Sequence, residues 1–177
     1  MKRGYVQVYT GNGKGKTTAA LGLCVRALGA GLSVYIGQFI KGMKYSEIVT
    51  LEKLSALSGA GRLVVEQYGR GCFIFREPQP EDLAAARSGL EKAMAATRSG
   101  QFDLVILDEI NVASRYGFVT EEDFASLLDA RPGNVELVLT GRYAPECLLA
   151  RADLVTEMKE LRHYYAAGVE ARDGIER

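Results

Sequence analysis

Short apolar runs alternate with longer amphipathic segments along most of the 177-residue chain. The apolar runs are rich in branched and aromatic residues, which favour buried β-strands. They predict strands at residues 5–9, 33–40, 62–68, 103–108, 135–140 and 153–158. Between these runs the apolar residues recur at the spacing of an α-helix. This spacing predicts helices at residues 16–28, 46–57, 81–97, 120–129 and 144–150, followed by an irregular tail at 163–177.

The order of these segments indicates the class of fold. Strands that alternate with helices through short connections form a parallel sheet with helices on both faces. The chain is therefore predicted to be a single α/β domain spanning residues 1–177, a length usual for one domain. In such sheets the ligand binds at the carboxyl ends of the strands. The predicted strand ends are 10–11, 38–42, 69–75, 108–109 and 140–142.

The first of these strand ends carries a phosphate-binding motif. Residues 5–18 read YVQVYTGNGKGKTT, which is a strand, a glycine-rich loop and the start of a helix. Glycine lets backbone N–H groups turn towards an anion, and the helix N-terminus adds free donors and a positive dipole. In such a loop the lysine reaches the phosphates and the next hydroxyl ligates Mg²⁺, which assigns Lys16 and Thr17. The predicted nucleotide-binding residues of the loop are Gly11, Asn12, Gly13, Lys14, Gly15, Lys16, Thr17 and Thr18.

One position departs from the usual motif, G-x-x-x-x-G-K-[ST]. That pattern has glycine at position 10, where this chain has Thr10. A basic surface turn that contains GKT by chance is the alternative explanation. Because the loop follows a strand and precedes a helix, a phosphate loop is the preferred interpretation. It predicts a P-loop nucleotide-binding fold of the RecA-like, three-layer type.

Composition narrows the class of protein further. Lys and Arg together number 22, as do Asp and Glu, so net charge gives no argument for binding nucleic acid or an acidic membrane surface. Cys24, Cys72 and Cys147 include no C-x-x-C pair, so neither a zinc ribbon nor a disulfide framework is supported. No apolar stretch is long enough for a signal sequence or a transmembrane helix. A cytoplasmic protein with free thiols is therefore expected.

Charged residues lie at the other strand ends. Asp108 and Glu109 follow four apolar residues, and a strand that delivers a carboxylate to its tip is the usual second half of a Mg²⁺–nucleotide site. With Thr17 they are the predicted metal ligands. Arg142 is a further candidate for the nucleotide site. For the side chains of Arg142 and Lys41, a role in a surface ion pair is about as well supported as a contact with phosphate.

Two phenylalanines after the third strand are a further candidate. Phe73 and Phe75 lie in a glycine-rich segment and are separated by one residue. In an extended chain both side chains point the same way, so they can form an apolar platform for a large flat ligand. Anchoring the loop to the core is an equally good explanation.

Together these motifs resemble those of a known enzyme family. The segments GNGKGKTTAA, QFIKG, VILDE, TGR and ADLVTEM, with the tail RHYYAAGVEARDGIE, resemble the corrinoid (cob(I)alamin) adenosyltransferases of the ATP-binding P-loop type. The resemblance extends over nearly the whole chain. The loop motif is common to many nucleotide enzymes, whereas the other segments at these separations are more specific. This chain reaches its first strand at residue 5, where longer relatives carry a segment that can fold over the active site.

The resemblance implies a reaction. In that family a Co(I) corrinoid attacks C5′ of ATP, forms adenosylcobalamin or another adenosylcorrinoid, and releases triphosphate. Lys16, the loop N–H groups and Mg²⁺ would stabilise the charge on the departing triphosphate. No general base is needed, which suits a chain whose one histidine, His163, is expected to be structural.

The resemblance also makes Lys16, Phe73 and Phe75 the catalytic candidates. The aromatic pair is similar to one that excludes the lower axial ligand of the corrinoid, which leaves a four-coordinate Co(II) that is easier to reduce to Co(I). Tryptophan is an option at the second position in that family. An electron donor of the flavin-reductase type and a homodimer are further implications.

Other classes of nucleotide protein are the alternatives. A P-loop ATPase or a GTPase switch would use hydrolysis to drive a partner, but the N-K-x-D motif that GTPases use to read the base is missing. A thymidine-kinase-like enzyme would bring a cysteine-rich zinc lobe, which is missing too. A nucleotide-binding module without catalysis is the third alternative.

Overall fold

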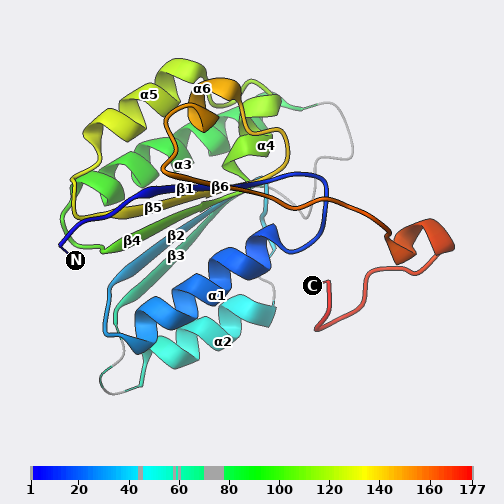
Figure 1. The fold of residues 1–177 in the computed structure, drawn as a ribbon, viewed down its shortest axis with the longest axis horizontal. Helices are drawn as coiled ribbons and strands as arrows, with labels where there is room; N and C mark the ends of the chain where they lie inside the picture. The colour runs from blue at the N-terminus through cyan, green and yellow to red at the C-terminus, as the bar shows by residue number, and fades with distance from the viewer. Residues whose placement is uncertain (1, 44–45, 58, 60, 70–77, 177) are drawn as a thin grey trace.

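The computed structural model describes residues 2–43, 46–57, 59, 61–69 and 78–176. Within them, six parallel strands form one sheet in the order β3-β2-β4-β5-β1-β6 (Figure 1). The strands are β1 (Val6–Thr10), β2 (Val34–Phe39), β3 (Leu63–Tyr68), β4 (Leu104–Asp108), β5 (Glu136–Thr140) and β6 (Leu154–Glu157). The parallel sheet predicted from the sequence is confirmed, and each strand begins and ends within one residue of its predicted range.

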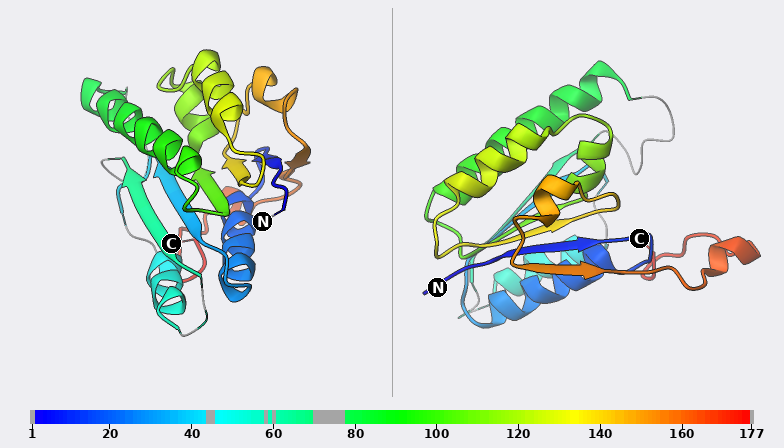
Figure 2. Two further views of the ribbon diagram at one scale, coloured as in Figure 1. Left: turned by 90° about the vertical axis from the view of Figure 1, so that its left-hand side faces the viewer. Right: turned by 45° about the horizontal axis from the view of Figure 1, so that its top comes forward.

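Helices cover both faces of the sheet, which makes three layers (Figure 2). On one face lie α1 (Lys16–Gly29) and α2 (Ser46–Ser55). On the other face lie α3 (Pro80–Arg98), α4 (Ile110–Arg115), α5 (Glu121–Ala130) and α6 (Glu146–Leu149). Each face has its own apolar core. Since alternate residues of a strand face opposite ways, Ile106 of β4 packs in the first core and Leu107 packs in the second.

Local signals explain where some helices begin and why one was missed. The Thr120 hydroxyl accepts a 3.3 Å hydrogen bond from the Asp123 N–H, and the Asp123 carboxylate accepts one of 2.9 Å from the Thr120 N–H. This is the predicted capping box, and it starts α5. The helix α4 was not predicted, because six residues are too few to show helical spacing. It also begins after Glu109, whose left-handed backbone (φ 59°) is unlike an ordinary N-cap.

Gly89 of α3 lies against Tyr68 of β3. A Cβ atom at Gly89 would lie 2.3 Å from Tyr68 Cγ, far inside van der Waals contact. We therefore expect Gly89→Ala to lower the free energy of unfolding by about 1–3 kcal/mol, the usual cost of overpacking. Gly22 of α1 is the matched control, because a Cβ atom there meets nothing within 4 Å. Gly22→Ala should raise stability by up to about 1 kcal/mol. Urea unfolding measures both, and a shift of the same sign in the two variants would contradict the packing argument.

The carboxyl ends of the parallel strands meet at one edge of the sheet, and this edge carries unusual backbone. Ile40, Glu109 and Tyr143 are the non-glycine residues with positive φ in the described ranges, at 64°, 59° and 62°. They follow β2, β4 and β5. Such conformations cost about 1–3 kcal/mol each and are concentrated at functional sites. The candidate site therefore lies at this edge, as the strand order predicts.

Candidate active site

The loop between β1 and α1 is shaped by its glycines. Gly11 and Gly15 have left-handed backbones with φ of 95° and 115°, which glycine adopts without strain. Gly11 and Gly13 also lie against the chain that follows β6, since a Cβ atom on either would lie 2.4 or 2.8 Å from the Met158 carbonyl oxygen. That oxygen accepts a 2.7 Å hydrogen bond from the Gly13 N–H. The glycines therefore serve the contact with the segment after β6 as well as the turn.

Thr10, which departs from the usual motif, connects β1 to two other segments. Its carbonyl oxygen accepts a 2.9 Å hydrogen bond from the Met158 N–H. Its hydroxyl oxygen accepts one of 3.3 Å from the N–H of Ala144, after β5. Glycine at this position would keep the first contact and lose the second. Because Ala144 is 134 residues away, this role could not be predicted from the residues around Thr10.

Lys16 folds over its own loop. Its Nζ donates hydrogen bonds to the carbonyl oxygens of Gly11 (2.8 Å) and Gly13 (2.7 Å), and the residue is buried. Burial lowers the pKa of the Lys16 ammonium, against the opposing effect of the Glu109 carboxylate. An anion that enters the loop would form stronger, charge-assisted bonds with this ammonium than the two carbonyl groups do.

Asp108, at the end of β4, is the centre of a buried polar cluster. Its Oδ1 accepts hydrogen bonds from the hydroxyl groups of Thr17 (2.9 Å) and Thr140 (2.6 Å). Its Oδ2 accepts from Lys41 Nζ (2.7 Å) and Gln38 Nε2 (3.2 Å). Burial would raise the pKa of Asp108, but Lys41 and the hydroxyl donors outweigh it, and the net shift is downward. Lys41, whose role the sequence left open, is therefore the ion-pair partner of Asp108.

Glu109 has the opposite electrostatic character. Its backbone N–H donates a 3.1 Å hydrogen bond to the Thr140 hydroxyl oxygen. Burial raises the pKa of the Glu109 carboxyl, and the neighbouring Asp108 charge raises it further. Across the described ranges, no hydrogen bond or ion pair to the Glu109 carboxylate is found. A half-buried carboxylate in this state gains from a nearby cation.

The side-chain oxygens of Thr17, Asp108 and Glu109 are suitable ligands for a magnesium ion that is also bound to phosphates. Mg²⁺ prefers oxygen ligands and usually takes one or two carboxylates, with waters and phosphate oxygens as the rest. No group of three or more His, Cys, Asp or Glu side chains in the described part of the chain forms a dedicated metal site. The Asp108 carboxylate already accepts hydrogen bonds from four side chains, which leaves it less available to a metal ion. Glu109 and Thr17 are therefore better suited to bind the ion directly.

Other predicted residues are not part of this cluster. Exposed side chains are found at Asn12, Thr18 and Arg142. Lys14 is bonded to the C-terminal tail. Phe73, Phe75 and Cys72 lie outside the described residues. His163 accepts a hydrogen bond from the Tyr165 N–H at Nδ1 and caps the turn η1 (Tyr164–Ala167), a structural role.

No individual role was predicted for Gln38, Thr140 or Asn111, although Gln38 and Thr140 lie within the predicted strand ends 38–42 and 140–142. Gln38 and Thr140 are buried polar residues at the carboxyl ends of apolar strands, which is the signal that could have found them. Asn111 is a buried amide at the start of α4, and its Nδ2 donates a 3.2 Å hydrogen bond to the Gly141 carbonyl oxygen. Its role was hidden because α4 itself was not predicted.

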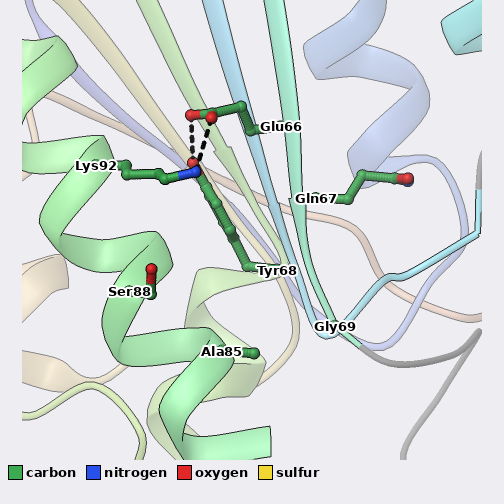
Figure 3. Close-up of a pocket in the computed structure, with 7 residues that line it drawn as sticks. All are labelled: Glu66, Gln67, Tyr68, Gly69, Ala85, Ser88 and Lys92. Atoms are coloured by element: carbon green, nitrogen blue, oxygen red, sulfur yellow. Dashed lines mark hydrogen bonds and ion pairs between the residues drawn. The ribbon is translucent and has the colours of Figure 1, made fainter.

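A separate pocket of about 400 Å³ opens between β3 and α3 (Figure 3). Its lining residues are Glu66, Gln67, Tyr68, Gly69, Ala85, Ser88 and Lys92. The Glu66 carboxylate accepts hydrogen bonds from the hydroxyl groups of Tyr35 and Tyr68 and from Lys92 Nζ. None of the lining residues belongs to the loop between β1 and α1 or contacts Asp108, so this pocket is separate from the candidate site.

The fold is similar to that of a known structure. The flagellar accessory protein FlaH from Methanocaldococcus jannaschii superimposes with a TM-score of 0.57 over 89% of this chain and 72% of that chain. The two sequences are 14% identical, so the likeness concerns the fold alone. It supports the RecA-like class predicted from the sequence.

Sequence comparisons cover nearly the whole chain. It is 33% identical over 175 residues to a corrinoid adenosyltransferase of Pseudomonas aeruginosa, covering 99% of this chain and 84% of that protein. It is 33% identical over 182 residues to the corrinoid adenosyltransferase CobA of Salmonella typhimurium, covering 99% and 86%. The family model described as ATP:corrinoid adenosyltransferase BtuR/CobO/CobP matches residues 2–177. The chain therefore belongs to the ATP:corrinoid adenosyltransferase family.

Proposed function

We propose that this chain transfers the 5′-deoxyadenosyl group of ATP to a Co(I) corrinoid and releases triphosphate through the groups around its phosphate loop. The observation that carries the proposal is the convergence of Lys16, Thr17 and Asp108 at that loop, in a member of this family. ATP and the corrinoid are both substrates. Whether the corrinoid is cobalamin or a precursor does not change the chemistry at the phosphate end.

The reaction needs stabilisation of a leaving group and no proton transfer. The electron pair of Co(I) forms the Co–C5′ bond while the C5′–O bond breaks, and the electrons of that bond leave with triphosphate. Charge therefore develops on the phosphate oxygens, where preorganised donors are most effective. In our proposal, Lys16 exchanges its carbonyl partners Gly11 and Gly13 for these oxygens when ATP binds. The exposed Asn12, Thr18 and Arg142 would contact the nucleotide from the rim of the loop.

A magnesium ion is part of the proposal. Thr17 and Glu109 would hold it, and Asp108 would orient the Thr17 hydroxyl through their 2.9 Å hydrogen bond. When bound, the ion would neutralise charge on the triphosphate. Burial raises the pKa of Glu109 and the Asp108 charge raises it further, and a cation beside Glu109 would oppose both effects.

Phe73 and Phe75 are proposed to form the apolar wedge on the corrinoid. The double variant Phe73→Ala/Phe75→Ala is expected to lose at least about tenfold more activity when the assay starts from Co(II) than when it starts from chemically prepared Co(I). The reason is that exclusion of the axial ligand assists reduction and not alkyl transfer. Parallel anaerobic assays measure the ratio. An equal loss with both starting states would show that the pair is only structural.

The partners and the compartment are also part of the proposal. An electron donor of the flavin-reductase type would supply Co(I). A homodimer is supported by the edge strand β6, where Leu154 and Val155 are 44% and 48% exposed. A reducing, cytoplasmic setting is supported by the free thiols of Cys24 and Cys147. In the part of the chain that the structure describes, every helix is too short or too polar to span a bilayer.

Product analysis tests the proposed reaction. The protein is mixed anaerobically with MgATP and a Co(I) corrinoid, and the absorption spectrum of the Co–C bond is followed. Phosphate products are separated by ion-exchange chromatography, with a mixture lacking corrinoid as the control. Triphosphate in equal amount to the adenosylcorrinoid is expected. ADP and phosphate in its place would point to an ATPase or a kinase-like enzyme and would overturn the proposal.

A further inference from the structure

The C-terminal tail leaves the sheet after β6 and then returns to the phosphate loop (Figure 1). It forms the turn η1, reverses at Gly168, whose backbone is left-handed (φ 82°), and comes back to the loop through Ile175 and Glu176. Nearly all of its residues are exposed. A segment with so little apolar burial is held mainly by its polar contacts, and these converge on one residue of the loop, Lys14.

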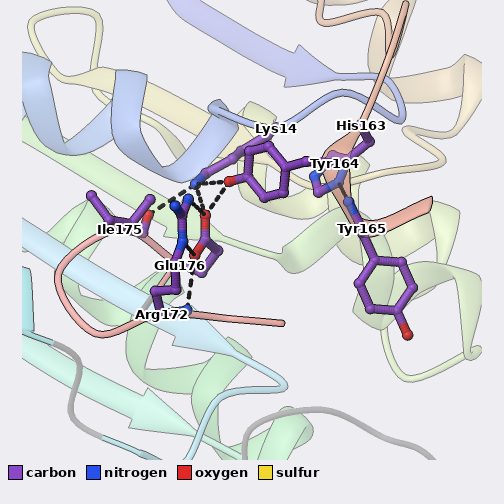
Figure 4. A network of polar contacts seen from close by, with 7 residues as sticks. All are labelled: Lys14, His163, Tyr164, Tyr165, Arg172, Ile175 and Glu176. Atoms are coloured by element: carbon purple, nitrogen blue, oxygen red, sulfur yellow. Dashed lines mark hydrogen bonds and ion pairs between the residues drawn. The ribbon is translucent and has the colours of Figure 1, made fainter. Parts of the chain in front are cut away.

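Lys14 is bonded to both ends of the tail (Figure 4). Its Nζ donates hydrogen bonds to Glu176 Oε1 (2.8 Å), to the Ile175 carbonyl oxygen (2.9 Å) and to the Tyr164 hydroxyl oxygen (3.3 Å). Among the residues that the structure describes, every acceptor found for Lys14 belongs to the tail. The two lysines of the loop are therefore used differently, because Lys16 is bonded to the loop itself.

The tail organises Glu176 for this contact. The Glu176 carboxylate accepts hydrogen bonds from the Arg172 N–H (2.9 Å), from the Arg172 guanidinium (3.3 Å) and from the Tyr164 hydroxyl. The Arg172 guanidinium lies 5.0 Å from the centre of the Tyr164 ring. The Glu176 side chain is only 16% exposed as a result. The Arg172 and Lys14 hydrogen bonds lower the pKa of Glu176, so it is an anion at any physiological pH.

Glu176 is an anionic partner of the Lys14 ammonium, so an anionic ligand of the loop would compete with it for Lys14. The Lys14 side chain is 42% exposed, and an ion pair with an exposed partner contributes little to stability because solvent and salt screen it. A triphosphate carries several negative charges, attracts Lys14 more strongly and repels Glu176. The ion pair, together with the hydrogen bonds from Lys14 to Ile175 and Tyr164, contributes to holding the tail on the loop, and it is weak enough for a triphosphate to break.

We propose that the C-terminal tail is an ionic latch on the phosphate loop, in which Glu176 holds the Lys14 ammonium and a triphosphate group takes it over. Binding of ATP then releases the tail from the loop, and departure of the product triphosphate lets the tail return. Glu176 is a positioning residue that acts through Lys14. The latch rests on the proposed function, because it requires the loop to bind a triphosphate.

Glu176→Gln tests the latch, because glutamine keeps the size of the side chain and removes its charge. Inorganic tripolyphosphate, titrated calorimetrically at low and high salt, is expected to bind the variant about two- to fivefold more tightly at low salt, which corresponds to the loss of one exposed ion pair. Trypsin cleavage at Arg162 and Arg172 reports the state of the tail. Tripolyphosphate should accelerate this cleavage in the wild-type protein, and the variant should be cleaved rapidly without it.

Glu170→Gln is the matched control, since it removes one carboxylate of the same tail outside the Lys14 contacts. It should leave both the affinity and the cleavage rate unchanged. A tail that only stabilises the loop predicts the opposite for Glu176→Gln, with unchanged or weaker binding, and that result would overturn the latch. Failure of tripolyphosphate to bind the wild-type protein and the variant alike would instead refute the phosphate loop of the proposed function, and the latch with it.

Discussion

Replacement of Lys16 by alanine is expected to lower kcat for adenosyl transfer by about 100- to 1000-fold, the usual cost of removing a preorganised donor from a developing anion. The ammonium lies within 2.8 Å of two loop carbonyl oxygens, so in the ligand-free protein it is already held at the site where phosphate would bind. Because the charge of the triphosphate grows as the C5′–O bond breaks, the loss should fall mainly on kcat. Single-turnover formation of the Co–C bond measures it with saturating ATP.

Lys53→Ala is the control for the loss of a lysine, because Lys53 is an exposed residue in the last turn of α2. Its rate should stay within about twofold of the wild-type rate. Urea unfolding of both variants shows whether the Lys16 variant is folded. A folded Lys16→Ala protein with a near-normal rate would remove the phosphate loop from the mechanism. Lys16→Arg, which keeps the charge with a different geometry, should recover only part of the rate.

Replacement of Asp108 by alanine is expected to lower the free energy of unfolding of the ligand-free protein by about 3–5 kcal/mol. The carboxylate is fully buried and is 2.7 Å from Lys41 Nζ, so its removal leaves a buried ammonium without this counter-ion. The hydroxyl groups of Thr17 and Thr140 lose their shared acceptor as well. Urea unfolding without nucleotide measures the change.

Two further variants distinguish this charge effect from other causes. Asp129→Ala breaks the exposed ion pair with Arg151 and should cost less than about 1 kcal/mol. The double variant Asp108→Leu/Lys41→Met removes both buried charges and should recover most of the stability, since apolar replacements of a buried pair are often neutral. A similar loss of stability in the Asp108 and Asp129 variants would show that the buried ion pair contributes no more to the free energy of unfolding than the exposed one. The double variant should remain inactive, because Thr17 loses its orienting partner.

The strands and the phosphate loop could be predicted because their signals are local. A run such as LVILD identifies β4 by itself, and the glycines before Lys16 identify the loop. The helix α4 could not be found in the same way. Its six residues begin one residue after β4, and the residue between them, Glu109, has a left-handed conformation that only the tertiary structure maintains.

The hydrogen-bond partners of Asp108 could not be predicted from any single segment of the sequence. Lys41 follows β2 and Thr140 ends β5, and both reach Asp108 because β4 lies between these strands in the sheet. The parallel register then sets Gln38 of β2 opposite Asp108. The sequence predicted that polar strand ends would gather at one edge, but the order of the strands decides which of them touch.

The position of β1 between β5 and β6 has a consequence for synthesis. Of the six strands of the sheet, β1 is synthesised before the others, yet its two neighbours, β5 and β6, are synthesised after the other strands of the sheet. Gly13 and Thr10 also bond to Met158, which follows β6. The loop sequence exists early in translation, but its surroundings form only through contacts of very long sequence separation, which are slow to close. We therefore expect a nascent chain to bind nucleotide only after β5 and β6 have been synthesised.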